Sequence, residues 1–560
     1  MTEKIWLKQY PEEIPQQVQY EERTLQSYLS EAGEEASEQI AIHFMGKELT
    51  YAEMMRAAKR LGAYLQKVGI EKGDRIAVML PNTPQAAIAF YGVLDAGAIV
   101  VQTNPLYTER ELEYQLQDSG AKAIITLKAL YPRVANIRQR TELEHIITTG
   151  VEDYLPFPKN KLYPSIERKK TKIIVDFPKD SQISDFKKIV DQEQGELTEY
   201  DFAFDDEAVL QYTGGTTGPP KGVMLTHENL VANVSMCNAW LYKSKKGEEV
   251  VLGVIPLFHV YGMTTVLLLS VMQHYKMVLM PQFKPEDVLK TIEKQKPTFF
   301  PGAPTIYIGL LNHPKIEKYD LSSIEACISG SAPLPVEVKK KFEQLTGGRL
   351  VEGYGLTETS PVTHANFVWK NEARVGSIGV PWPNTDACIL GPHDSDAVGS
   401  EYVGEIAIKG PQVMKGYWNR PQDTEETFRD GWLLTGDLGY MDEDGYFYIV
   451  DRKKDMVIAG GFNIYPREIE EVFYEHEAVQ EVVVIGIPDP YRGETVKAFI
   501  VLRPGYEVTE KELNKFARKH LAAFKVPHYY EFREDLPKTA IGKILRRVLI
   551  DEEKKKTKSK

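Results

Sequence analysis

Short apolar segments alternate with helical segments along two long stretches of the sequence, and this alternation limits the fold more than any other feature. In the first stretch an apolar segment at 75–80 precedes a helical segment at 83–96, and a second apolar segment follows at 98–102. The second stretch repeats the scheme, with strands expected at 250–255, 277–280, 298–300, 326–329 and 349–352. Apolar strands between helices are typical of parallel sheets that are covered on both faces. The sequence therefore predicts an α/β fold with two such sheets in a large N-terminal lobe.

Capping residues mark one helix of the first stretch. Thr108 is followed three residues later by Glu111, which is the spacing of a capping box, and Gly120 closes the same segment. A capping box satisfies two free N–H groups at a helix start, and glycine readily adopts the left-handed conformation that ends many helices. We therefore expect a helix that begins after Thr108 and ends at Gly120.

The pattern changes after about residue 381. Residues 405–409 alternate in polarity with period two, which indicates a small antiparallel β unit. The residues beyond 451 mix strands with helices and are numerous enough to form a core of their own. We predict an N-terminal domain at 1–450, which includes the β unit, a charged hinge at 451–455 and a C-terminal domain at 456–560.

The charge balance and the cysteines exclude several classes of protein. The chain carries 68 basic and 80 acidic residues, a net charge of −12, which excludes a general nucleic-acid binder. Cys237, Cys327 and Cys388 lie far apart and form no CxxC pair. This spacing excludes a disulfide framework and a cysteine-built zinc site. The first residues are followed by polar sequence rather than by the apolar stretch of a signal peptide, so we expect a cytoplasmic protein.

Two segments bear on contact with membranes. The most apolar segment, 250–272, is interrupted by Pro256, His259 and Gly262, so we expect a buried strand and helix there rather than a membrane span. The segment 154–172 mixes prolines and aromatic residues with lysines and arginine. Two interpretations remain for it, a solvated loop and a peripheral contact with the anionic inner face of the membrane.

The segment 212–222 reads YTGGTTGPPKG and carries the strongest chemical signal in the sequence. Its glycines let backbone N–H groups converge, while threonine hydroxyls and Lys221 add donors and positive charge, and this combination suits a polyphosphate. Lys221 stands between Pro220 and Gly222, so the segment is not a Walker A motif, and it lacks the G-x-G-x-x-G spacing of a dinucleotide site. The sequence therefore predicts a phosphate-binding loop.

This loop resembles the phosphate loop of the adenylate-forming superfamily, which includes acyl-CoA synthetases, luciferases and the adenylation domains of peptide synthetases. The superfamily's other motifs are matched in the same order by the segments 256–263, 330–333, 354–359, 432–437 and 536–547. Gly214, which stands where the commonest form of the loop has serine, and the segment 460–466 make the chain most similar to bacterial long-chain fatty acid–CoA ligases. The resemblance implies a small β-barrel in the large lobe and a mobile α+β C-terminal domain.

The resemblance also implies roles for individual residues. The residues that match ATP-binding positions are Thr213, Gly214, Gly215, Thr216, Thr217, Gly218, Lys221, Gly330, Ser331, Ala332, Tyr354, Gly355, Thr357, Asp437 and Arg452. Those that match the Mg²⁺ site are Thr213 and Glu358, and Lys543 matches the catalytic lysine. Lys454 matches the hinge position. His259 and Met263 match the acyl pocket, and Gly460 and Gly461 match the tunnel for CoA.

These matches imply an ATP-dependent long-chain fatty acid–CoA ligase that uses ATP, CoA and Mg²⁺. Such an enzyme forms an acyl-adenylate and pyrophosphate, then transfers the acyl group to CoA and releases AMP. The alternatives are a ligase for aryl or medium-chain acids, an enzyme that loads a carrier protein, a luciferase-like oxygenase, and an inactive nucleotide-binding scaffold. The scaffold is disfavoured because Lys543, Glu358, Asp437 and Arg452 are all in place. The sequence leaves open whether the chain is a homodimer.

Overall fold

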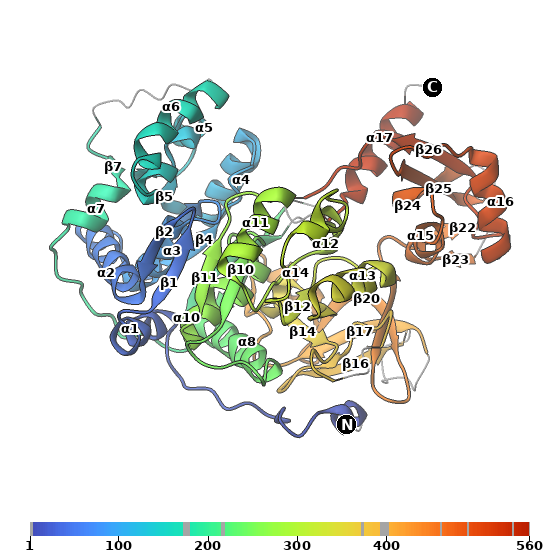
Figure 1. Ribbon diagram of the computed structural model, residues 1–560, viewed down its shortest axis with the longest axis horizontal. Helices are drawn as coiled ribbons and strands as arrows, with labels where there is room; N and C mark the ends of the chain where they lie inside the picture. Colours follow the sequence, from blue (N-terminus) through green and yellow to red (C-terminus); the bar gives the residue numbers. More distant parts are fainter. Residues whose placement is uncertain are drawn as a thin grey trace.

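The computed structural model of the chain describes residues 4–171, 180–213, 219–370, 374–391, 402–459, 462–489, 492–539 and 543–558. The helices and strands form a large lobe, blue to orange in Figure 1, and a smaller orange-red C-terminal domain that stands to one side of it. The mixed α/β architecture predicted from the sequence is confirmed.

The first sheet of the large lobe has eight strands. They are β3 (Arg75–Met79), β4 (Ile99–Gln102), β5 (Ala121–Leu127), β6 (His145–Thr149), β7 (Ile183–Asp185), β8 (Glu207–Thr213), β9 (Lys221–Thr226) and β18 (Gly416–Tyr417). Their order is β18-β9-β8-β4-β3-β5-β6-β7. The strands from β8 to β7 run parallel, as predicted, whereas β9 is antiparallel to β8, and β18 to β9.

Helices cover this sheet and follow the sequence signals. α4 (Glu109–Ser119) is capped by Thr108 and Glu111 in a capping box and ends at Gly120, whose φ is 59°, so the predicted boundaries are confirmed. α3 (Pro84–Asp95) is buried along nearly its whole length because its residues are small or apolar all round. It packs between the sheet and the amphipathic helix α2 (Tyr51–Lys67).

The second region joins two four-stranded sheets. One contains β10 (Val250–Gly253), β11 (Lys276–Leu279), β1 (Ile40–Phe44) and β2 (Lys47–Thr50), and the other contains β12 (Ala326–Ser329), β13 (Arg349–Gly355), β14 (Val362–Ala365) and β15 (Val380–Pro381). Phe299 forms parallel bridges to Val251 and to Ala326, which connect the two sheets. The strand expected at 298–300 is therefore reduced to a bridge.

The helices beside these sheets are α8 (His227–Trp240), α10 (Leu269–Gln273), α11 (Pro285–Gln295), α12 (Pro304–Leu311) and α13 (Val336–Thr346). The apolar segment 250–272 forms β10, the short α9 (Val260–Gly262), a π-helical turn at Met263–Leu268 and most of α10, and most of its residues are buried. Within the described parts of the chain, no helix has both the length and the apolar character that a membrane span needs.

The β unit contains β16 (Asp386–Leu390), β17 (Gly404–Lys409), β19 (Phe428–Arg429), β20 (Trp432–Met441) and β21 (Phe447–Arg452). All of its pairs are antiparallel, as the sequence predicted. The pairing among the described residues follows an open path, and closure into a barrel stays a prediction.

The described residues of the C-terminal domain form a five-stranded sheet and three helices. Its elements are β22 (Val457–Ala459), β23 (Phe462–Ile464), α15 (Pro466–Tyr474), β24 (Val479–Asp489), β25 (Gly493–Leu502), α16 (Glu510–His520), β26 (Tyr529–Arg533) and α17 (Arg546–Lys558). Among the described residues, no hydrophobic cluster combines side chains from both sides of residue 451. The large lobe and the C-terminal domain therefore have separate cores. All three cysteines are buried and free.

Candidate active site

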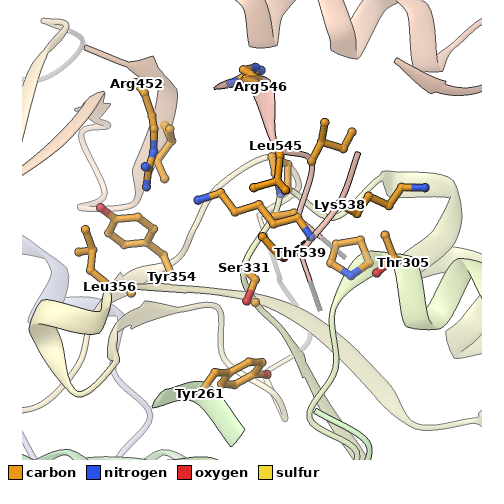
Figure 2. A pocket seen from close by; sticks show the side chains of 18 of the residues that line it. Tyr261, Thr305, Ser331, Tyr354, Leu356, Arg452, Lys538, Thr539, Leu545 and Arg546 are labelled. Carbon is orange, nitrogen blue, oxygen red and sulfur yellow. Dashed lines mark hydrogen bonds between the residues drawn. The ribbon is translucent and has the colours of Figure 1, made fainter. Parts of the chain in front are cut away.

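Most of the predicted site residues line one cleft of about 3200 Å³ between the large lobe and the C-terminal domain. They are Thr213, Lys221, His259, Gly330, Ser331, Ala332, Tyr354, Gly355, Thr357, Glu358, Asp437, Arg452, Lys454 and Lys543. In Figure 2, Tyr354 and Ser331 lie on the large-lobe side of the cleft, and Thr539 and Leu545 approach from the C-terminal domain. The fold thus brings residues that are distant in the sequence to one site.

The glycine- and threonine-rich part of the predicted phosphate loop is not described. Gly214, Gly215, Thr216, Thr217 and Gly218, together with Gly460 and Gly461 of the predicted CoA tunnel, lie outside the described residues. The strands that flank the loop are described: β8 ends at Thr213, β9 begins at Lys221, and these two residues pair across the antiparallel ladder. Thr213 and Lys221 therefore lie side by side in the cleft wall.

Tyr354, Asp437 and Arg452 form a hydrogen-bonded group on the large-lobe wall. The Tyr354 hydroxyl donates to Asp437 Oδ2 at 2.6 Å, and Arg452 Nε lies 3.0 Å from Asp437 Oδ1. β20 and β21 place Asp437 opposite Arg452 in antiparallel register, and Figure 2 shows the Arg452 side chain reaching towards the Tyr354 ring. The Asp437 carboxylate raises the pKa of Arg452, whereas burial and then this carboxylate raise the pKa of Tyr354. A charged acceptor beside an aromatic face suits the hydroxyls and the flat base of a nucleoside.

Lys543 of the C-terminal domain lines the cleft. Its N–H donates to the Thr539 hydroxyl at 3.1 Å, and the Thr539 N–H donates to the Lys543 carbonyl at 2.8 Å. The charge of Arg452 and then burial lower the pKa of Lys543 to about 8. A guanidinium that lowers the pKa of a nearby ammonium marks a region of positive potential, which favours the binding of an anion. The geometry therefore places a positive focus beside Tyr354 and Asp437.

His259 caps the short helix α9 and faces the same region. Its Nδ1 accepts a hydrogen bond from the Tyr261 N–H at 3.3 Å. Burial and then the charge of Lys543 lower the pKa of His259 to about 4, so the ring is neutral at pH 7. Met263 begins the π-helical turn and is fully buried in the largest core cluster. Such turns are frequent at functional sites.

Close backbone packing fixes the ends of β12 and β13, next to the residues that match ATP-binding positions. A Cβ on Gly330 would lie 3.2 Å from the Tyr261 ring, and a Cβ on Gly355 would lie 1.9 Å from the Pro361 carbonyl oxygen. Ser331, directly after Gly330, has a φ of 71°. Gly355 thus has no room for a side chain, and the chain turns there into the short helix Thr357–Thr359, which contains Glu358.

Lys221 and Glu358 are held by residues that the sequence did not single out. Lys221 Nζ lies 2.5 Å from Asp423 Oδ1 and 4.8 Å from the centre of the Tyr417 ring. The Tyr417 hydroxyl donates to Glu358 Oε1 at 2.8 Å. Tyr417 reaches this position because β18 pairs with β9, and Asp423 follows on α14 (Pro421–Thr427). Strand pairing at this sequence separation has no local signal, which is why sequence analysis missed both residues.

The predicted hinge is joined to the C-terminal domain by charged groups. Arg546 forms ion pairs through Nη2 with Glu470 Oε1 at 2.6 Å and through Nη1 with Asp455 Oδ2 at 3.0 Å. Its Nη1 also lies 4.0 Å from Asp451 Oδ1. Asp451 Oδ2 also accepts the N–H of Arg467 in the first turn of α15 at 2.9 Å. Burial raises the pKa of Asp451, whose side chain is 2 % exposed. Arg546 follows Lys543 in the motif 536–547, but nothing in the sequence indicates a role for it.

Comparisons with known proteins agree with this geometry. The family model described as AMP-binding enzyme matches residues 29–418, and the model for the AMP-binding enzyme C-terminal domain matches residues 468–543. A long-chain-fatty-acid–CoA ligase of Bacillus subtilis is 57% identical over 99% of this chain and 98% of its own length. A long-chain-fatty-acid–CoA ligase of Salmonella typhimurium is 38% identical over the full length of both chains.

The fold also matches solved structures. The crystal structure of the anthranilate CoA ligase AuaEII in complex with anthranoyl-AMP superposes with a TM-score of 0.84, at 27% identity, and the match covers 96% of this chain and 98% of that one. Both domain models, the full-length relatives and the structural match lead to the same assignment, and the chain belongs to the AMP-binding enzyme family.

Proposed function

We propose that the chain is an AMP-forming acyl-CoA ligase whose substrates are long-chain fatty acids, ATP and CoA. The observation that carries this proposal is the 57% identity, over 99% of the chain, to the long-chain-fatty-acid–CoA ligase of Bacillus subtilis. The convergence of Lys543, Arg452 and Asp437 in one cleft supports it, because these groups suit an acyl phosphate anhydride attached to a nucleoside.

In the first step, a carboxylate oxygen of the acid attacks the α-phosphorus of ATP and pyrophosphate leaves. The protein has to align the two reactants and offset the negative charge on the phosphoryl oxygens. We assign this charge compensation to Lys543, which lies close enough to Arg452 for their charges to interact. Asp437 and Arg452 would hold the ribose, and Tyr354 would stack on the adenine against the turn at 330–332.

The residues present fit a magnesium ion that is bound together with the triphosphate. Mg²⁺ prefers hard oxygen ligands, and it is held by one or two carboxylates plus substrate phosphates. Glu358 and the Thr213 hydroxyl line the same cleft, and Lys221 lies nearby to pair with phosphate. When bound, the ion neutralises charge on the triphosphate and orients it.

In the second step, the CoA thiol attacks the acyl carbonyl and AMP leaves with the electron pair of the broken bond. A thiol with a pKa near 8.5 is a fair nucleophile at neutral pH, so no dedicated base is required. His259 is neutral and borders the region of Lys543, where it can contact the acyl carbonyl. We propose that the C-terminal domain turns about Lys454 between the two steps, which withdraws Lys543 and brings Gly460 and Gly461 to the thiol.

The decisive experiment for the substrate class is ATP–pyrophosphate exchange with carboxylic acids of increasing chain length, followed by addition of CoA. Exchange that saturates with long-chain acids, and thioester formation after CoA is added, would support the proposal. Saturation with aromatic or medium-chain acids alone would favour the aryl or medium-chain ligase. Exchange without transfer to CoA, but with transfer to a carrier protein, would identify a carrier-loading enzyme.

The proposed hinge is tested by a substitution that stiffens it. Lys454→Pro restricts the backbone at the hinge and should spare pyrophosphate exchange while it blocks thioester formation from supplied acyl-AMP. Full turnover by this variant would contradict the hinge role.

A mass of two chains in analytical ultracentrifugation of the wild type would support the homodimer that the sequence leaves open.

We also propose that α6 (Lys159–Thr171) contacts an anionic membrane surface. Figure 1 places α6 at the edge of the large lobe, on the side away from the C-terminal domain. Phe157 is 81 % exposed, and Leu162 and Ile166, one turn apart on α6, are 57 % and 60 % exposed. The exposed lysines beside them are Lys159, Lys161 and Lys169. Exposed apolar side chains flanked by lysines fit a bilayer that contains anionic lipid.

Co-sedimentation with vesicles tests this contact. The wild type should sediment with vesicles of phosphatidylglycerol and phosphatidylcholine more than with phosphatidylcholine alone. The double substitution of Leu162→Ser and Ile166→Ser should lower the bound fraction several-fold, because it removes the apolar anchor. An unchanged bound fraction would contradict this assignment of the surface.

A further inference from the structure

One aromatic side chain touches both of the charged groups assigned to the triphosphate and its metal ion. The hydroxyl of Tyr417 donates to Glu358 Oε1 at 2.8 Å, while the ring of the same residue lies 4.8 Å from Lys221 Nζ. Glu358 therefore contacts the hydroxyl of this side chain, and Lys221 contacts the face of its ring. This contact pattern is not part of any motif that we identified in the sequence.

The backbone around Tyr417 is fixed on several sides. Tyr417 pairs with Val223 in the ladder between β18 and β9, and its own N–H donates to the Thr424 hydroxyl at 2.9 Å. The Met414 N–H donates to the Glu358 carbonyl at 2.8 Å. The side chain is 8 % exposed. A buried side chain with a fixed backbone cannot change its position without a change in the sheet.

Without Tyr417 between them, the Glu358 carboxylate and the Lys221 ammonium would attract each other. A carboxylate that pairs directly with an ammonium has its charge satisfied, and a metal ion must then displace that partner before it can bind. Here the Glu358 carboxylate accepts from a neutral hydroxyl, whereas the Lys221 ammonium lies over the ring face and pairs with Asp423 Oδ1 at 2.5 Å. A tyrosine offers both contacts because its hydroxyl is polar and its ring face attracts cations.

We propose that Tyr417 is a positioning residue that keeps Glu358 oriented for the metal ion and keeps the Lys221 ammonium from pairing with that carboxylate. The inference rests on the proposed function, because it takes Glu358 as a ligand of Mg²⁺. The hydrogen bond engages Oε1, one of the two oxygens of the carboxylate, and so orients the group. Partners of this kind behind a metal ligand are typically worth a ten- to hundredfold change in metal affinity.

Two substitutions separate the two contacts. Tyr417→Phe removes the hydroxyl and keeps the ring, whereas Tyr417→Leu removes both. With the full-length protein and a non-hydrolysable ATP analogue, calorimetry gives the Mg²⁺ concentration for half-maximal binding and the Kd of the analogue at saturating Mg²⁺. Tyr417→Phe should raise the half-maximal Mg²⁺ concentration roughly tenfold and leave the Kd of the analogue within about twofold. Tyr417→Leu should in addition weaken the analogue about threefold, because Lys221 loses the ring.

Matched variants distinguish the ways in which the proposal can fail. Tyr448→Phe also removes a hydroxyl that donates to a carboxylate, Asp442 at 3.2 Å, but in the β unit, and it should change neither quantity. If Glu358→Gln raises the Mg²⁺ requirement and Tyr417→Phe does not, the positioning role is wrong and the proposed metal site stands. If Glu358→Gln leaves the Mg²⁺ requirement unchanged, the metal site fails and the positioning role fails with it. Melting temperatures show that each variant is folded.

Discussion

The two walls of the cleft are built by different physical means. On the large-lobe side, Tyr261 and Gly330 are backed by packed aromatic side chains such as Tyr307 and Phe342, and this wall is continuous with a buried apolar core. On the C-terminal side, the loop that carries Lys543 is tied down next to Arg546, which is surrounded by Glu470, Asp455 and Asp451. These ion pairs lie within the C-terminal domain and the hinge, and no hydrophobic cluster of the described residues joins the two walls. The two walls can therefore separate without exposing a shared apolar core.

The largest expected effect comes from removing the Lys543 ammonium from the C-terminal wall. Lys543→Ala should lower the rate of pyrophosphate exchange about a thousandfold, because it removes a fixed cation from developing charge. Thioester formation from supplied acyl-AMP should persist. The control is Lys538→Ala, in the same loop but paired with Glu481 at 2.8 Å, which should lose much less. Equal losses in both half-reactions would contradict the division of labour.

The next largest effect comes from removing the ion pairs of Arg546 behind that wall. Arg546→Met leaves Glu470, Asp455 and Asp451 without their shared cation, which should lower the free energy of unfolding of the C-terminal domain by about 3 kcal/mol. Urea denaturation followed by hydrogen exchange resolves the two domains. The large lobe should be unaffected.

Arg547→Met serves as the control for this experiment. Arg547 is 51 % exposed, and its substitution should change stability by less than about 0.5 kcal/mol. A similar loss in both variants, or a loss spread over both domains, would show that the two walls are not supported separately.

The pH dependence of the first step sharpens the comparison. The pKa of Lys543 is lowered to about 8, so its ammonium is present below that pH and is lost above it. The kcat/KM for pyrophosphate exchange should be flat towards lower pH and fall about tenfold for each pH unit above 8. Lys543→Arg keeps its charge at these pH values and should show no such fall, although its absolute rate will be lower. The same decline in both proteins would assign the pKa to another group.

The smallest effect concerns an exposed contact between the hinge and the large lobe. Lys453 Nζ lies 2.9 Å from Glu405 Oε2, and the lysine side chain is 62 % exposed. Lys453→Ala should change the free energy of unfolding by less than about 1 kcal/mol and leave both half-reactions near the wild-type rates. A loss of stability comparable to that of Arg546→Met would show that solvent exposure does not explain the difference between the Lys453–Glu405 pair and the ion pairs of Arg546.

The sequence predicted the elements that local signals define. The capping box at Thr108 and the alternation around 405–409 reappear in the structure because they depend on residues a few positions apart. The sequence does not predict that β1 pairs with β11, since that pairing joins segments at opposite ends of a long stretch of chain. The barrel remains untested, as its closure is a property of long-range pairing.

The candidate site divides in the same way. Motifs identified Tyr354, Asp437, Arg452 and Lys543, and the structure brings them into one cleft. Tyr417 and Arg546 escaped notice because their importance depends on partners, Glu358 and Glu470, that only the folded chain brings near. A side chain that acts by touching another functional group has no signature of its own.

The position of Asp451 has a consequence for protein engineering. This first residue of the predicted hinge lies on β21 of the β unit, yet its carboxylate binds the first turn of α15 and faces Arg546. A chimera that takes its C-terminal domain from a relative would inherit the arginine from one parent and the acid from the other. Junctions should therefore be chosen so that both come from the same parent, and grafts that separate them should dock poorly even when each half folds.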